Sequence, residues 1–335
     1  MSKTTQILET VLNVPMPAEG GEVSINGFDF VMRGNVLRQK SLVKGVQEDM
    51  ADFYEKHWKL SGAYDFEASD EFQRELFQAM FPGYEGKVPK QIGQGAVVLD
   101  AGCGSGAAGR AYFRGLFNRL VYICVDMSSA IEQAQADFST RGIEVGLLQA
   151  EVNHLPFKPA TFDFVFCPGV LHYTLDMQEA ILSLAKFLKP GGRFVTWIYK
   201  KQKPIRQLTD TYIRSVVSEM SPQDAFEVIK PLTKLGIALG KMKQEIEIPE
   251  DIPFLDIKAG KYDLQRFFYY HIMKLFYNPE LPFTRHVVNN WNAYYPKHVL
   301  FLPVEEIRGF FANAGMGIEE SHEQGNGISI IAVKQ

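Results

Sequence analysis

The sequence predicts an α/β fold, in which a doubly wound, mostly parallel sheet is covered by helices on both faces. Three apolar residues, 97–99, are typical of a buried strand and run into a glycine-rich turn at 102–106. A second apolar strand follows at 120–125, and helical stretches such as 177–188 separate the strands. Strands that alternate with helices imply right-handed crossovers and a parallel sheet.

The composition narrows the class of protein. A chain of 335 residues, 46% of them hydrophobic, can form one large domain or a domain with a substantial insert. The formal net charge of −4 argues against a broad nucleic-acid-binding surface. The sequence contains no stretch of about eighteen apolar residues, the length that a transmembrane helix needs. Residues 1–14 lack a signal-peptide pattern. We therefore expect a cytoplasmic protein.

The three cysteines predict neither a metal site nor a disulfide framework. Cys103, Cys124 and Cys167 all fall in predicted strands or in the turns that follow them. Their spacing matches no metal-binding pattern, so we expect small core residues in a reducing compartment and no bound metal.

The glycine-rich turn predicts a ligand site. Gly102, Gly104 and Gly106 stand at every second position, where they let the backbone and a helix N-terminus approach a ligand closely. Glycines alone are a weak dinucleotide fingerprint. Asp100, two residues before the first glycine, would repel a pyrophosphate but suits a ligand that carries an ammonium group.

Five segments, in order, resemble the class I S-adenosylmethionine (SAM) methyltransferases, in particular the small-molecule type 11 group. They are residues 97–106, the strand ending in Asp126, the Glu-x-x-x-Leu-Pro-Phe stretch within 149–157, residues 162–172, and the turn 188–194. The resemblance implies a Rossmann-like sheet of seven strands with an antiparallel last strand. It also implies SAM as the cofactor and a small molecule as the partner.

The same resemblance assigns cofactor-binding positions. Asp126 stands where an acid holds the ribose hydroxyls, and Glu151, where most members have Asp, stands where an acid accepts from the adenine amino group. Tyr54 and Trp58, one helical turn apart, either close over the cofactor as a lid or dock on the core. The full set of cofactor-binding candidates is Asp100, Gly102, Cys103, Gly104, Gly106, Asp126, Met127, Glu151, Val152, Cys167, Tyr54 and Trp58.

We expect four parts along the chain. Residues 1–95 form a β-hairpin and helical lid extension, and 96–201 form the SAM-binding core. Residues 202–299 form a mainly helical cap inserted after the fifth strand, and 300–335 supply a helix and strands that complete the core. Ligands bind at the carboxyl ends of strands in such sheets, so a cap that leaves the fifth strand should lie over the substrate.

Local patterns predict the elements outside the core. Asn26-Gly27 predicts the turn of paired strands over 22–38. Pro303 and Gly315 bound a C-terminal helix. The other predicted elements are helices over 47–60, 69–80, 208–220, from 221 onward and over 262–277, and a strand over 327–333.

His172 is the candidate catalytic residue. Methyl transfer from a sulfonium needs alignment and exclusion of water, and a fixed catalytic group is not obligatory. His172 follows the predicted fourth strand, and imidazole titrates near neutrality, so it is the best candidate for a general base. The alternative is a structural histidine that bonds backbone in its loop.

The cap is rich in aromatic residues, which favours an apolar or aromatic substrate, although most of them are also suited to form the cap's own core. Residues 229–243 combine apolar residues with four lysines, a pattern that fits cap packing or peripheral contact with a membrane. The candidates for substrate contact are His172, Tyr173, Tyr269, Tyr270, Trp291, Tyr294 and Tyr295.

Several functions fit these features. The first is O-methylation of a small molecule in secondary or lipid-related metabolism, and the second is C-methylation of an isoprenoid or polyketide. A SAM-binding regulatory protein and a nicotinamide oxidoreductase are alternatives of other classes. Nucleic-acid or protein methylation lacks the Asn/Asp-Pro-Pro-Tyr/Phe segment, because Cys167-Pro168-Gly169 stands there instead. The sequence does not predict the oligomeric state.

Overall fold

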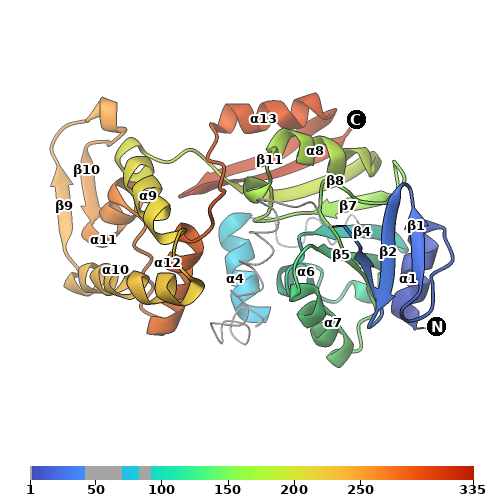
Figure 1. Ribbon diagram of the computed structural model, residues 1–335. Helices are drawn as coiled ribbons and strands as arrows, with labels where there is room; N and C mark the ends of the chain where they lie inside the picture. Colours follow the sequence, from blue (N-terminus) through green and yellow to red (C-terminus); the bar gives the residue numbers. More distant parts are fainter. Residues whose placement is uncertain (1, 42–69, 83–91) are drawn as a thin grey trace.

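The computed structural model describes residues 2–41, 70–82 and 92–335 (Figure 1). One large sheet forms the body of the molecule, and a mainly helical unit follows the carboxyl end of one of its central strands. The predicted helix over 47–60, with Tyr54 and Trp58, lies outside the described residues.

The predicted α/β fold is confirmed, and the predicted parallel strands occupy the centre of the sheet. The last strand in the chain, β12, pairs antiparallel with β8, as the sequence predicted. In sheet order the seven core strands are β6 (Gly146–Gln149), β5 (Leu120–Asp126), β4 (Ala96–Ala101), β7 (Phe162–Phe166), β8 (Leu188–Tyr199), β12 (Gly327–Lys334) and β11 (Met316–Gln324).

The N-terminal strands join this sheet, so it has ten strands in the described part of the chain, not the seven predicted. Strands β1 (Glu22–Ile25), β2 (Phe28–Arg33) and β3 (Val36–Gln39) form an antiparallel meander, and β3 pairs parallel with β6. The turn at Asn26-Gly27 is as predicted, with φ of 50° and 87°. The edge of β6 carries unpaired backbone groups that β3 satisfies, which explains the larger sheet.

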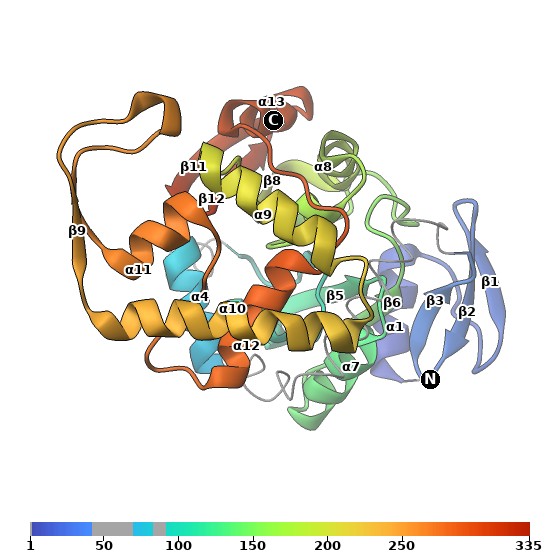
Figure 2. The same ribbon diagram turned by 60° about the vertical axis from the view of Figure 1, so that its left-hand side comes forward.

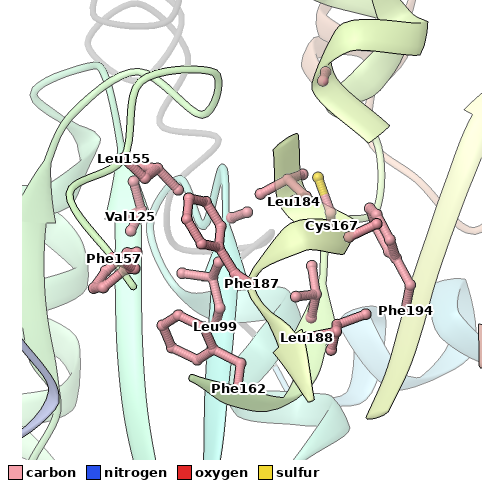
Figure 3. Close-up of a cluster of buried hydrophobic side chains, with 14 of the residues drawn as sticks. Leu99, Val125, Leu155, Phe157, Phe162, Cys167, Leu184, Phe187, Leu188 and Phe194 are labelled. Atoms are coloured by element: carbon pink, nitrogen blue, oxygen red, sulfur yellow. The ribbon is translucent and has the colours of Figure 1, made fainter. Parts of the chain in front are cut away.

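Helices cover both faces of the sheet, and alternate residues of each strand point to opposite faces. On β4, Leu99 belongs to one buried cluster and Val98 to the other. Figure 3 shows part of the first cluster, where Leu99, Val125 and Phe187 gather. This face is covered by three helices: α1 (Lys3–Leu12), α8 (Met177–Lys186) and α13 (Val304–Asn313). The other face is covered by α4 (Asp70–Met80), α6 (Ala107–Tyr112), η1 (Phe117–Arg119) and α7 (Ala130–Thr140).

The inserted unit has a buried cluster of its own, which includes Ile229, Val287 and Trp291. Helix α10 begins where the sequence predicted, since the Ser221 side chain accepts from the Asp224 N–H. Helix α12 packs against both α10 and α9 (Figure 2). The elements are α9 (Pro204–Val217), α10 (Pro222–Met242), β9 (Glu245–Ile248), η3 (Pro253–Leu255), β10 (Gly260–Asp263), α11 (Leu264–Phe267), a π-helical turn η4 (Phe268–Ile272) and α12 (Phe283–Tyr294).

The predicted helix over 262–277 is confirmed only in part. Residues 264–272 are helical, as α11 and η4, whereas 262 and 263 end β10 and the chain becomes extended at Met273, whose φ is −163°. The N–H groups of Lys274 and Phe276 bond to the side chains of Asp210 and Asn290. These long-range hydrogen bonds replace the helical ones after Ile272.

No helix among the described residues is long and apolar enough to cross a membrane. In the lysine-containing segment of α10, Ile229, Thr233 and Gly236 are buried, whereas Leu235 and Met242 are exposed. The buried face packs within the cap, and peripheral membrane contact stays a prediction.

The structure suggests that the cap can be removed. The chain leaves the core at Lys201 and returns at Leu302, and the Lys201 N–H donates to the Leu302 carbonyl over 2.8 Å. We predict that a protein lacking 203–297, with the ends joined by a short linker, still binds SAM and unfolds cooperatively. Calorimetry and thermal unfolding test this. If both SAM binding and cooperativity disappear, the cap is part of the main core.

Candidate active site

A single cavity lies at the carboxyl ends of β4, β5 and β6 and beside the loop after β7. Four loop segments form most of its wall, and Gln73, Ala107, Ala108, Tyr173 and Thr174 complete it. The four segments are the turn 102–105, the β5 end 126–128, Glu151-Val152, and 168–170. The cavity therefore lies where doubly wound sheets bind ligands.

The glycine-rich turn has a backbone that other residues adopt only at a cost. Gly102 and Gly104 have φ of 76° and 54°, values that glycine adopts freely. A Cβ on Gly102 would lie only 2.4 Å from Cγ2 of Val170, in the loop after β7. The turn therefore packs closely against that loop and presents its backbone to the cavity.

Asp126 ties this turn to the end of β5. Its Oδ2 accepts from the Gly104 N–H over 2.7 Å, and its Oδ1 accepts from the N–H and the hydroxyl of Ser128. Burial raises the pKa of Asp126, and these hydrogen bonds act against that rise. Among the described residues Oδ2 accepts one hydrogen bond, so it can accept another from a hydroxyl in the cavity.

Asp100 lies under the turn and does not line the cavity. Its Oδ2 accepts from the Tyr122 hydroxyl over 2.7 Å, and a Cβ on Gly109 would lie 2.4 Å from the same oxygen. Burial raises its pKa to about 7, while the Tyr122 bond lowers it and the charge of Asp126 raises it further. The Tyr122 hydroxyl thus occupies Oδ2, and the contact of Asp100 with the ligand's ammonium group stays a prediction.

Glu151 offers the test of whether SAM fits this cavity. Its side chain lines the cavity but is only 3% exposed. Oε2 lies 3.1 Å from Nδ1 of His154 and, within the described part of the chain, has no aligned hydrogen-bond donor. A buried acceptor without a donor is costly, so this oxygen fits a ligand N–H such as that of an adenine amino group. Together with Asp126, it would offer acceptors to the ribose and the base of a bound nucleoside.

Most of the predicted cofactor-binding residues meet at the cavity. Those that line it are Gly102, Cys103, Gly104, Asp126, Met127, Glu151 and Val152. Gly106 lies against Phe138 and Cys167 is fully buried; neither lines the cavity. Tyr54 and Trp58 lie outside the described residues. Sequence reasoning missed Gln73, Ser105, Ala107, Ala108, Ser128, Pro168, Gly169, Val170 and Thr174.

The sequence contained a pattern that could have identified Ser128 as part of the site. A serine two residues after an acid commonly bonds it in a local turn, as Ser128 does with Asp126. Tyr122 had one as well, because a tyrosine inside an apolar strand needs a hydrogen-bond partner, and Asp100 on the adjacent strand provides it.

His172 is buried beside the cavity and does not line it. Its Nδ1 accepts from the Tyr199 N–H over 3.3 Å, and its carbonyl accepts from the Leu300 N–H. Burial, with a further contribution from the charge of Lys274, lowers the pKa of His172 to about 3. The expected ionisation near neutrality is therefore corrected. The catalytic role stays a prediction, and the contacts match the structural alternative.

Among the predicted substrate residues other than His172, Tyr173 alone lines the cavity. Trp291 and Tyr294 are buried in the cap cluster, and Tyr295 stacks on Trp291. Tyr269 and Tyr270 lie beside the β11–β12 turn: the Tyr269 hydroxyl accepts from Asn326, and Tyr270 contacts the Gly325 position. Packing of the cap's own core and its contact with β11–β12 explain why these residues do not reach the cavity.

The sheet and the cavity at its carboxyl edge agree with the SAM-binding domain that the sequence predicted. Residues 99–196 match the family model of a methyltransferase domain. This segment is similar to the class I SAM-dependent methyltransferases of the type 11 group, and the similarity supports SAM as its cofactor.

Several curated relatives carry methyltransferase names. YodH of Bacillus subtilis, an uncharacterized methyltransferase, is 28% identical over 47% of this chain and 65% of its own length. UbiE of Haemophilus ducreyi, a ubiquinone/menaquinone biosynthesis C-methyltransferase, is 30% identical over 38% of this chain and 52% of its own. A ubiquinone biosynthesis O-methyltransferase of Rickettsia conorii is 26% identical over 46% of this chain and 52% of its own. The chain thus spans between about half and two thirds of the length of these relatives.

Solved structures also resemble the chain. The PH0226 protein of Pyrococcus horikoshii has a TM-score of 0.44 and 14% identity, covering 84% of this chain and 99% of its own. A SAM-dependent methyltransferase of Aquifex aeolicus has a TM-score of 0.42 and 13% identity, covering 80% of this chain and 99% of its own.

The Asp126 bonds lead to a prediction about SAM affinity. Asp126→Ala removes a charged acceptor from the cavity and frees the Gly104 N–H. We expect SAM binding to weaken by about 1.5–3 kcal/mol, roughly ten- to a hundredfold. Calorimetric titration measures this, with Glu132→Ala, an exposed acid on α7, as the control. Unchanged affinity in the Asp126 variant would remove Asp126 from the binding site.

The contacts of His172 predict that His172→Asn keeps most of the turnover. The Asn carbonyl can accept from the Tyr199 N–H but cannot take up a proton near neutral pH. Steady-state turnover of native, His172→Asn and His172→Ala proteins tests this. If both variants lose about 10²- to 10⁴-fold, the usual contribution of a general base, the structural alternative is wrong.

The dependence of the free energy of unfolding on pH gives a control for the structural role of His172. The pKa of His172 in the folded protein is about 3, below the value of 6.5 expected when unfolded, so the unfolded chain takes up the proton first. The stabilisation is present above pH 6.5 and is lost as the pH falls toward 3. Between pH 6.5 and 5 the native free energy of unfolding should fall by about 1.5–2 kcal/mol more than that of His172→Asn.

Proposed function

We propose that this protein transfers the methyl group of SAM to an oxygen of a small apolar or aromatic molecule. The observation that carries this is the joint wall of the cavity, where Asp126 and Glu151 share one space with Tyr173. Polar acceptors for a nucleoside thus lie beside an aromatic side chain that continues toward the cap.

In this proposal the residues of the chain bind SAM and the acceptor and orient them. SAM, when bound, supplies an activated methyl group on sulfur. The turn at Gly102 and Gly104 permits close approach, while Asp126 and Glu151 offer hydrogen-bond acceptors. Val170 and Tyr173 form an apolar wall that excludes water beside the reacting groups. Alignment and desolvation of this kind supply a large part of a displacement rate.

The way in which the acceptor loses its proton limits the kind of substrate. Burial and Lys274 hold the pKa of His172 at about 3, and its Nδ1 is occupied by the Tyr199 N–H. His172 is therefore a weak general base, and an acceptor whose hydroxyl ionises readily by itself does not need a strong one. An acceptor with an acidic hydroxyl, such as a phenol or an enol, fits this environment.

Transfer to carbon of an isoprenoid or polyketide is the second candidate. An enol or a phenol reacts at carbon as well as at oxygen, and neither route needs a strong base. The relatives' names include both C- and O-methyltransferases. The alternative from another functional class is a regulatory protein that binds SAM without turnover. The cytoplasmic location stays a prediction.

Cofactor choice and turnover can be tested together. We predict that SAM raises the melting temperature and that NADH does not, because a carboxylate pair suits amino and hydroxyl groups and disfavours a pyrophosphate. Incubation of the protein and SAM with a phenol library should give products heavier by 14 mass units. A shift with NADH alone contradicts the proposal, and SAM binding without any product supports the regulatory alternative.

A further inference from the structure

A second cavity lies between the cap and the core, and its volume is about 580 Å³. The core contributes Lys200 and Lys201, which directly follow β8, and Glu323 at the end of β11. The cap contributes Lys258 from the loop between β9 and β10, and His271 from η4. The described residues that line this cavity include none that line the cofactor cavity, so the two cavities are separate.

Hydrogen bonds fix the core wall of this second cavity. The Lys200 N–H donates to the Asn326 carbonyl over 3.0 Å, and the Lys201 N–H donates to the Leu302 carbonyl over 2.8 Å. The buried side chain of Gln202 donates from Nε2 to the same Asn326 carbonyl over 3.0 Å. The end of β8 is thus tied to the turn between β11 and β12, and the two lysines extend from a fixed backbone.

The cap wall is fixed in the same way, through the loop between β9 and β10. Asp251 Oδ1 accepts from the Ala259 N–H over 2.8 Å, and Asp251 Oδ2 pairs with Lys258 Nζ at 2.8 Å. The Tyr262 hydroxyl donates to the Lys258 carbonyl over 2.8 Å. The fold therefore builds both walls of the cavity from its own contacts.

Positive charge exceeds negative charge in this cavity, although the formal net charge of the chain is −4. Four lysines line it, against two acids. Lys203 pairs with Asp256, and Lys200 pairs with Glu323 at 3.0 Å. Arg308 also lies 3.8 Å from Glu323, so two cations share that acid. The cavity is thus suited to an anion.

Lys201 is the lysine of this cavity that no acid balances. Its side chain forms no ion pair or hydrogen bond within residues 2–41, 70–82 and 92–335. The paired lysines are partly exposed, with 23%, 37% and 75% of the side chains of Lys200, Lys203 and Lys258 accessible to water. Exposed ion pairs contribute little to stability, so these lysines can turn toward a bound anion.

His271 gives this cavity a buried polar group without a partner. The residue is only 7% exposed, and its ring stacks on Phe267 and meets Tyr262 edge to face. No described residue forms a hydrogen bond with its Nδ1. Burial, with a further contribution from the charge of Lys203, lowers the pKa of His271, so the neutral ring offers one N–H donor. A buried ring without a partner is costly, and a ligand in the cavity can supply the partner.

We propose that this cavity binds a small phosphate-bearing molecule, held between Lys201 of the core and Lys258 and His271 of the cap. A phosphate group carries about two negative charges and three acceptor oxygens, so it can contact several lysines at once. Lysines bind phosphate as point charges, whereas a carboxylate offers them one charge and two oxygens. Tyr270 and Val304 also line the cavity and can pack against the body of the ligand. The inference goes beyond the proposed function and does not depend on it.

Calorimetric titration of the full chain at low ionic strength tests this site. The probe is phenyl phosphate, and benzoate is the carboxylate of similar size. We expect phenyl phosphate to bind more tightly than benzoate, and we expect Lys201→Gln and His271→Phe each to weaken its binding by about fivefold or more. Lys234→Gln removes an exposed lysine of α10 that lies outside the cavity, and it should leave the affinity unchanged.

The two variants are chosen so that the fold survives them. Lys201 has no side-chain partner to lose, and Phe at position 271 keeps an aromatic ring on Phe267. Thermal unfolding without ligand checks this, and phenyl phosphate should raise the melting temperature of the native protein.

Three results would overturn the proposal: no binding of phenyl phosphate, equal affinity for benzoate, or full affinity in either Lys201→Gln or His271→Phe. Titrations with and without SAM locate the probe. Equal affinity in both agrees with a cavity separate from the cofactor, whereas displacement of phenyl phosphate by SAM would place it in the cofactor cavity and contradict the inference.

Discussion

The hydrogen bond between the Asp126 carboxylate and the Gly104 N–H holds the two halves of the cofactor cavity together. It joins the turn after β4 to the end of β5, and Ser128 fixes the same carboxylate from the other side. The tight glycine backbone, its contact with Val170 and the shape of the cavity all depend on this junction. Asp100 and Tyr122 support it from beneath.

The cap is organised around buried polar groups, unlike the apolar clusters of the sheet. Asp210 bonds to Arg206, Tyr294 and the backbone of Lys274, and so connects three separate stretches of the insert. Its negative charge is compensated by Arg206, whose Nε lies 3.1 Å from Asp210 Oδ2.

Local patterns were sufficient for the core of the fold. The apolar strand 97–99, the glycines after it and the Asp126 strand are read from neighbouring residues, and the structure has them in the predicted order. The pairing of β3 with β6 joins residues more than a hundred positions apart, and no local pattern encodes it. The path of 262–277 depends on Asp210 and Asn290, which are equally outside any local window.

For the site, the sequence located the residues better than it oriented them. Glu151 and Asp126 line the cavity, but Asp100 faces Tyr122, and His172 is bound to the Tyr199 backbone. A crystal structure with S-adenosylhomocysteine is the most direct test of the account. It should place the ribose hydroxyls within about 3.2 Å of Asp126 and the adenine amino group at Glu151. A ligand bound elsewhere, or a ligand in this cavity that contacts neither carboxylate, would contradict it.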